Sequence, residues 1–375
     1  QSGPWQLGGQ GQFCPAVSTG RHNTGFKPAN GLAVKQTPIS CISSCITDGY
    51  FSGAWDGNFE QLDVLNDLAA AWLTKIRWPV CGITVLAEKT IALEYIINHE
   101  PAIRMAVFFG ILIVMAAWEL TAPRRRVEIP RLARWSNNLG LVVLDSLLVR
   151  LAFPVVAVGL AVVATENDWG LLNQVPIPGW IATILAVLAL DLAIYLQHVL
   201  FHAVPGLWRL HQVHHADLEF DVTTGVRFHP LEILISMAIK LLLILALGPP
   251  AIAVLIFEVL LNGKSLFNHS NVRLPSRLDA LLRLIIVTPD MHRVHHSILP
   301  SETNSNFGFN LPWWDRLLGT YLAQPSAGHV GMTIGIEQFR TKRNLWIDRL
   351  LLQPFRGPAS GYPLNSTDQK PEDDR

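Results

Sequence analysis

Three long apolar blocks after residue 100 constrain this chain most, because about 20 apolar residues are needed for a helix to cross a bilayer. The blocks are residues 102–120, 139–164 and 177–201, and each contains few charged residues. Only 15% of the whole chain is charged, compared with roughly 25% in a typical soluble domain. The sequence therefore predicts an integral membrane protein built from helices.

A fourth apolar block, residues 231–262, is interrupted by Gly248-Pro249-Pro250. Proline removes a backbone donor and clashes with the preceding helical turn, so this block is expected to form two short helices in a hairpin. The predicted fold is an all-α membrane bundle of about three spans plus this re-entrant hairpin. A cytoplasmic, His-rich helical cap is expected to hold a dimetal site.

The charges of the connecting loops predict the orientation in the membrane. The 121–138 loop contains five arginines, whereas the 165–176 loop contains two acidic residues and no Lys or Arg. Basic loops stay on the cytoplasmic side. Counting spans then places residues 202–230 and the region after 263 in the cytoplasm as well. The membrane is expected to be the inner membrane in a bacterium and the endoplasmic reticulum in a eukaryote.

Three segments are expected along the chain. Residues 1–92 are rich in Gly, Ser, Thr and Asn, show no sustained period, and are interpreted as an irregular N-terminal extension outside the working fold. Residues 93–325 form the membrane domain, and residues 326–375 form a C-terminal cytoplasmic segment with a polar tail. Equal numbers of basic and acidic residues, 29 of each, give no indication of a nucleic-acid partner.

Histidines form the main chemical motif. Ten of the 13 lie between residues 198 and 296, mostly in the patterns H-x3-H, H-x2-HH and a second H-x2-HH. Residues three and four apart share a helix face, so each pattern is expected to direct its imidazoles one way. His22, His99 and His329 are interpreted as structural. His229 is interpreted as a neighbour of the ligands rather than as a ligand.

The number and type of these side chains indicate which metal they would hold. All four cysteines lie in the first 81 residues, so a thiolate site further on is excluded. Eight or nine imidazoles are too many for one zinc ion, which takes four ligands. They are enough for two redox-active metal ions. Oxidation of an unactivated C–H bond needs such a cofactor, because no amino-acid acid or base abstracts that hydrogen.

One carboxylate lies on the same helical stripe as the first histidine pair. Asp191, Tyr195, His198 and His202 are spaced at i, i+4, i+7 and i+11. Because an ionisable residue within a span is usually functional, Asp191 is expected to orient His198 or a neighbouring ligand. The alternative is a helix-packing carboxylate paired with a buried arginine.

At these residues the chain resembles the fatty acid hydroxylase / sterol desaturase superfamily over roughly residues 100–325. The resemblance includes residues 207–215 (LWRLHQVHH), 227–232 (RFHPLE), 268–271 (NHSN), 288–296 (TPDMHRVHH) and 306–316. The spacing between the first two histidine motifs is similar to that in alkylglycerol monooxygenase-like members. The resemblance implies a di-iron centre, with O2 as co-substrate, at the cytoplasmic membrane surface.

Carried over by position, the resemblance implies nine metal ligands: His198, His202, His211, His214, His215, His269, His292, His295 and His296. Several branches of the family have a second histidine four residues after the one corresponding to His269. Here that position is Arg273.

The implied reaction is O2-dependent hydroxylation, or desaturation, of a lipid such as a fatty acyl chain, a sterol or an ether lipid. The chain contains neither the His-Pro-Gly-Gly motif of a cytochrome b5 haem site nor a rubredoxin-type cysteine pair. Electrons are therefore expected from an external donor of the ferredoxin, cytochrome b5 or reductase type.

Two non-redox functions are the alternatives to lipid oxidation. A zinc hydrolase of the intramembrane protease type would need His-Glu-x2-His, which the sequence lacks. A metal transporter or sensor would have its ligands near the middle of the spans, whereas these histidines are expected at one end of them.

Overall fold

All regular secondary structure is helical within residues 95–357 and 361–364, the part of the chain that this computed structural model describes. Only two isolated β-bridges join extended residues there. The all-α prediction is therefore confirmed for this part. The predicted extension, residues 1–92, lies outside the described residues.

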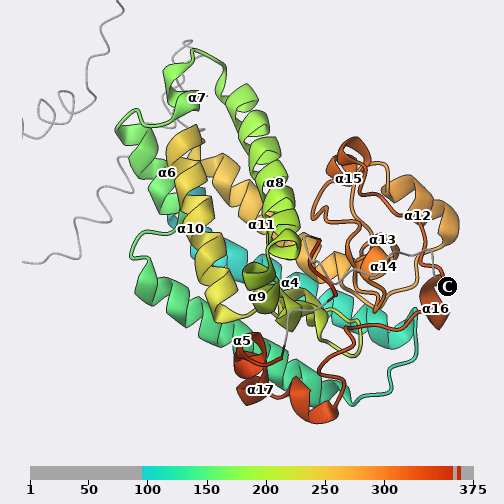
Figure 1. Ribbon diagram of the computed structural model, residues 1–375. Coiled ribbons are helices and arrows are strands. Elements are labelled where there is room, and N and C mark those ends of the chain that lie inside the picture. Colours follow the sequence, from blue (N-terminus) through green and yellow to red (C-terminus); the bar gives the residue numbers. More distant parts are fainter. Residues whose placement is uncertain (1–94, 358–360, 365–375) are drawn as a thin grey trace, which may run out of the picture. The chain divides into compact units, whose positions relative to one another are not determined.

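Among the described residues, five apolar helical stretches are long enough to cross a membrane, by length and composition. Four are single helices (Figure 1), and the fifth, residues 131–174, contains three consecutive helices. The helices are α4 (Glu100–Thr121), α5 (Arg131–Ala152), α6 (Ala157–Glu166), α7 (Leu171–Gln174), α8 (Gly179–Ala203), α10 (Pro230–Leu247) and α11 (Ala251–Asn268).

Two backbone breaks divide the apolar blocks. The expected break at Gly248-Pro249-Pro250 is present: α10 ends at Leu247 and α11 begins at Ala251. Gly248 has φ +59°, and a Cβ on it would lie 2.2 Å from the Trp169 carbonyl oxygen, so this close turn requires glycine. The block 139–164 is also divided, between α5 and α6, around Pro154.

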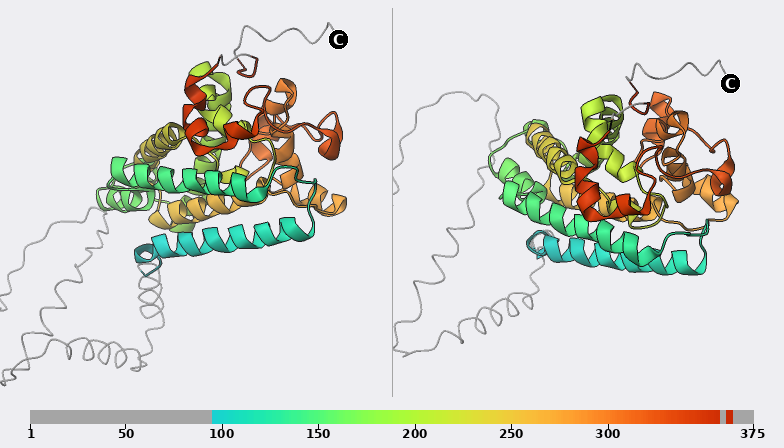
Figure 2. Two further views of the ribbon diagram at one scale, coloured as in Figure 1. Left: turned by 90° about the horizontal axis from the view of Figure 1, so that it is seen from below. Right: turned by 60° about the horizontal axis from the view of Figure 1, so that its bottom comes forward.

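Helix α11 lies at the centre of the bundle, in contact with α4, α6 and α8, while α10 packs on α5 and α6. Views from two further directions show α4 along one edge of the bundle, next to α11 (Figure 2). A buried cluster that includes Val158, Leu190, Ile244 and Phe257 joins α6, α8, α10 and α11. This packing leaves one end of α8 and α11 free to carry the histidines.

The arginines of the α4–α5 loop and the start of α5 hold the loops that follow the histidine motifs. Arg134 is fully buried and donates to Asp217, at 2.8 Å, and to Asp221. Arg124 pairs with Asp290 at 3.1 Å, and Arg125 donates to the carbonyl of His329 at 2.6 Å. These contacts place the loops after α4, α9 and α11 at the same end of the bundle.

The segment after residue 325 packs onto the rest of the domain. Leu350 of α17 (Ile347–Leu352) forms a buried cluster with Leu141 of α5 and Val213 of α9 (Pro205–His215). Further on, the buried Tyr362 stacks on Trp208 with ring centroids 5.4 Å apart. The C-terminal segment therefore covers the helix that carries the first H-x2-HH motif.

We expect Arg134→Met to lower the free energy of unfolding by about 3–5 kcal/mol, because it removes the cation that contacts the buried carboxylates of both Asp217 and Asp221. The measurement is the unfolding midpoint of the purified protein in detergent. Arg343→Met is the matched control, since it removes an exposed pair with Asp348 that contributes at most about 1 kcal/mol. Equal losses in the two variants would contradict the role assigned to Arg134.

Candidate metal centre

All nine predicted ligands are buried and converge at one end of the bundle. They come from α8, α9, the residue that caps α11, and α13 (Pro289–His295) with the residue that follows it. Two groups have ligand nitrogens within 4.8 Å of one another: His198, His202, His211, His215 and His295 in the first, and His214, His269, His292 and His296 in the second.

The sequence predicted that each H-x2-HH motif directs all its imidazoles one way. In the structure, each motif instead divides its imidazoles between the two groups. On α9, His211 and His215 belong to the first group and His214 to the second. On α13 the assignment is reversed, with His295 in the first group. At about 100° per residue, i and i+4 are about 40° apart, whereas i+3 and i+4 are about 100° apart. Each motif therefore contributes to both groups.

The imidazoles of each group face one another with their lone pairs. His198 donates from Nδ1 to the Phe307 carbonyl at 2.8 Å, and His295 donates from Nδ1 to the Ser305 carbonyl at 2.7 Å. A neutral imidazole carries one proton, so both Nε2 atoms present lone pairs. These two Nε2 atoms are 3.0 Å apart, which is repulsive unless a cation lies between them.

The second group repeats this geometry. His214 and His269 donate from Nδ1 to the carbonyls of Arg227, at 3.2 Å, and Ser265, at 2.8 Å. Their Nε2 atoms are 3.0 Å apart. Two nitrogens bound at about 2.1 Å to one metal, at a right angle, are also about 3 Å apart. Both nitrogens of the buried His296 lack a hydrogen-bond partner. Each group therefore fits a metal ion.

Burial keeps these imidazoles neutral in the metal-free protein. It lowers the pKa of His211 and of His269 to about 3. Burial, together with the neighbouring imidazoles, also lowers the pKa of His214, His215 and His292 well below the usual range. Neutral imidazole is the form that binds metals, so the site is ready for metal at neutral pH.

Two further side chains orient ligands, and the sequence had not indicated either of them as a site residue. Glu232, at the start of α10, accepts from His211 Nδ1 at 2.7 Å, and the Asn304 side-chain oxygen contacts His202 Nδ1 at 3.0 Å. Such partners fix the tautomer and the ring orientation of a ligating histidine. Glu232 is an acidic residue at the start of an apolar block, a signal that could have identified it.

Asp191 makes no hydrogen bond to a histidine within the described residues. Its carboxylate accepts from Asn310 Nδ2 and Trp314 Nε1, each at 2.8 Å. These bonds tie α8 to the loop whose Phe307 carbonyl accepts from His198. The structure therefore connects Asp191 to His198 through this loop rather than by direct contact, and pairs it with no arginine.

His229 and Arg273 lie outside both groups. His229 caps α10, where its Nδ1 accepts from the Leu231 amide at 3.2 Å and its Nε2 contacts the Leu351 carbonyl. It thereby fixes the helix start that presents Glu232 to His211. The side chain of Arg273 is exposed. His269 thus contributes to the second group without a companion histidine four residues later.

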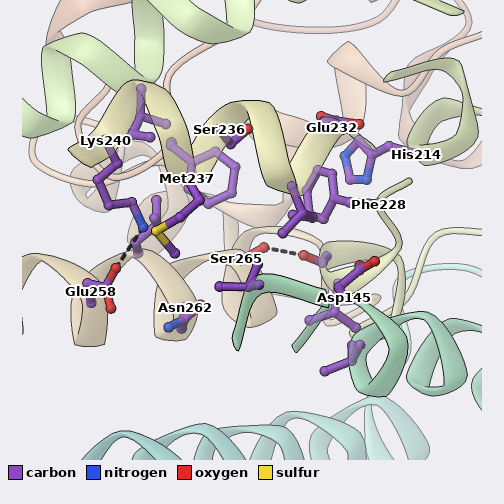
Figure 3. A pocket seen from close by; sticks show the side chains of 18 of the residues that line it. Asp145, His214, Phe228, Glu232, Ser236, Met237, Lys240, Glu258, Asn262 and Ser265 are labelled. Carbon is purple, nitrogen blue, oxygen red and sulfur yellow. Dashed lines mark hydrogen bonds and ion pairs between the residues drawn. The ribbon is translucent and has the colours of Figure 1, made fainter. Parts of the chain in front are cut away.

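A cavity of about 320 Å³ extends from the histidines into the bundle. Its walls come from α4, α5, α8, α10 and α11 and are mostly apolar, and His198, His211 and His214 reach it. Figure 3 shows His214 and Glu232 at one end of the cavity and Lys240 with Glu258 at the other. The volume falls within the range of small-molecule sites.

Residues 183–320 match the family model described as Fatty acid hydroxylase, and this range contains all nine histidines. The ornithine lipid hydroxylase OlsE of Rhizobium tropici is 34% identical over 152 residues, which are 40% of this chain and 45% of that protein. The human alkylglycerol monooxygenase is 31% identical over 157 residues, 41% of this chain and 34% of that protein.

The rat cholesterol 25-hydroxylase is 27% identical over 143 residues, 38% of this chain and 47% of that protein. The chain therefore spans less than half the length of each of these three relatives. No solved structure matches the chain.

We expect the stability of the metal-free protein to fall as the pH decreases from about 6.5 towards 3. The unfolded chain binds protons on its histidines below about 6.5, whereas folded His211 and His269 stay neutral down to about 3. The measurement is the unfolding midpoint against pH. His211→Asn should flatten this slope, and an unchanged slope would contradict the assignment.

We expect His214→Ala to lose bound metal and His229→Ala to retain it. Both side chains are buried, but only His214 belongs to a candidate metal group. The metal content per chain after purification from iron-supplemented cells, measured by mass spectrometry, tests this. Equal metal loss in the two variants would show that the groups do not define the site.

Proposed function

We propose that this chain is an O2-dependent oxidoreductase that hydroxylates an unactivated C–H bond of a membrane lipid. Desaturation is the close chemical variant. The match of residues 183–320 to the fatty acid hydroxylase model supports this reaction class. One observation carries the proposal. Nine buried imidazoles form two groups that could each hold a metal ion, at the end of a mostly apolar cavity that lies between candidate membrane spans.

The proposed cofactor is a pair of iron ions, one in each group. When bound, iron held by nitrogen ligands would supply the redox chemistry with O2 that a saturated C–H bond requires. The residues of the chain hold the ligands in place: carbonyl groups and Glu232 fix the rings of His198, His211 and His269. The positions of the ligands are therefore set before metal and substrate bind.

Aromatic side chains exclude water around the ligands. Phe228 stacks on His214 with ring centroids 4.5 Å apart, and Phe307 contacts His198 and His295 at 5.5 Å between centroids. A dry site limits loss of a reactive oxidant to water. The apolar cavity brings a lipid chain to the face of the histidine cluster that includes His198 and His214.

The relatives named above are a hydroxylase of ornithine lipid, a monooxygenase of alkylglycerol and a hydroxylase of cholesterol. Each of these names contains a lipid substrate, which supports the proposal that the substrate of this chain is also a lipid. The proposed substrate range is the one that the sequence motifs imply, namely a fatty acyl chain, a sterol or an ether lipid.

The membrane orientation is part of the proposal. The arginine-rich loop after α4 contacts the loops that surround the histidines, and basic loops stay cytoplasmic. The active site is therefore proposed at the cytoplasmic face of the bacterial inner membrane or of the endoplasmic reticulum. An external electron donor of the ferredoxin, cytochrome b5 or reductase type would dock on that face.

The test combines Mössbauer spectra of protein grown with iron-57 with lipid analysis of cells that express wild type or His214→Ala. We expect about two coupled irons per chain and an oxidised lipid that is absent from the variant. One zinc ion per chain, or an unchanged lipid profile together with metal uptake into vesicles, would instead support a zinc hydrolase or a metal transporter.

A further inference from the structure

One face of α10 carries a line of polar side chains along the cavity. In this otherwise apolar helix, Glu232, Ser236 and Lys240 are spaced at i, i+4 and i+8, and all three line the cavity. Polar groups inside a candidate span are costly and usually functional. A cavity that received only a hydrocarbon chain would not need them.

An ion cluster closes the end of the cavity away from the histidines. Lys240 of α10 and Arg104 of α4 both pair with Glu258 of α11, each at 2.7 Å. Arg104 also pairs with Glu100 at 3.3 Å. Glu258 is buried, and Lys240 and Arg104 are only partly exposed. We call these four residues the far-end cluster.

The length of α10 sets the distance between the two ends. Glu232, which contacts His211, precedes Lys240 by eight residues. At about 1.5 Å per residue, this corresponds to roughly 12 Å along the helix. A ligand that touches both the far-end cluster and the histidines therefore has a polar group and a reactive carbon about this far apart.

The cavity wall also contains buried acceptors without a protein partner. Asp145 Oδ1 and Gln197 Oε1 both lack a hydrogen-bond partner within the described residues. Asp145 is only 7% exposed, and both residues line the cavity. A buried polar atom left without a partner costs free energy. Donors on a ligand, such as hydroxyl or amide groups, would satisfy these atoms.

We propose that the cavity binds the polar part of the lipid substrate, with a zwitterionic headgroup at the far-end cluster and hydrogen-bond donors of the linking region at Asp145 and Gln197. This deepens the proposed function, on which it rests, because it names the class of lipid. The oxidised carbon then lies roughly 12 Å from the headgroup, the distance that the length of α10 sets.

The charges of the far-end cluster favour a zwitterion. Two cations and two carboxylates balance one another, so the cluster has no formal net charge. A purely anionic headgroup would compete with Glu258 for Lys240 and Arg104, and a cationic one would compete for Glu258. Either would leave a buried charge without its partner, which is costly. A headgroup with one positive and one negative charge can bind in the far-end cluster and leave every charge of the cluster paired.

Binding to the iron-free full chain in detergent tests the proposal. The probes are hexadecyl amphiphiles with phosphoethanolamine, phosphate or trimethylammonium headgroups, and native mass spectrometry gives each Kd. The variant is Lys240→Met with Glu258→Gln, which removes one charge of each sign and leaves Arg104 paired with Glu100. Leu242→Met, on the exposed face of the same helix, is the control.

We expect the zwitterionic probe to bind at least tenfold more tightly than either the phosphate or the trimethylammonium probe. The double variant should lose this preference, whereas Leu242→Met should keep it, with unchanged unfolding midpoints in both. Tightest binding of the phosphate or the trimethylammonium probe, or an unaltered preference in the double variant, would overturn the proposal. Because the assay uses neither iron nor O2, its outcome is independent of whether the chain hydroxylates lipid.

Discussion

Buried imidazoles whose Nε2 atoms face one another are the arrangement on which the rest of this structure depends. Within each group, Nε2 atoms lie 3.0 Å apart in surroundings that exclude water. Such contacts are unfavourable without a cation, so the surrounding protein must hold the rings in place against their repulsion. The Nδ1 atoms of six of the nine imidazoles do this through contacts with carbonyl groups, Glu232 and Asn304.

The loops that supply those carbonyls are themselves held by buried charges. Arg227 donates from Nε to the Val213 carbonyl at 2.8 Å, and its own carbonyl accepts from His214. Although burial opposes it, the positive charges of Arg134 and Arg227 lower the pKa of Asp217, which therefore stays ionised. Asn306, with φ +52°, bonds to the Met291 and Leu322 backbones and sets the turn that presents the Phe307 carbonyl. Ligand geometry thus depends on residues far from the metal positions.

The apolar bundle and the polar site meet in one cavity. The same helices that are apolar enough to cross a membrane contribute Glu232, Ser236 and Lys240 to its wall. In a bilayer these groups persist only where they find partners or line a protected space. Their placement along one side of α10 links the metal positions to the far-end cluster and gives the cavity two chemically different ends.

The sequence by itself determined the helical membrane class and the break at Gly248-Pro249-Pro250, because apolar length and proline chemistry are local properties. Its histidine motifs and their family resemblance supplied the nine candidate ligands. It did not determine how His214 separates from His211 and His215, which atoms Asp191 contacts, or that Glu232 orients His211. These depend on contacts between residues far apart in the chain, such as His214 with His269 and Asp191 with Trp314. Only the packing of α8, α9, α11 and α13 against one another decides them.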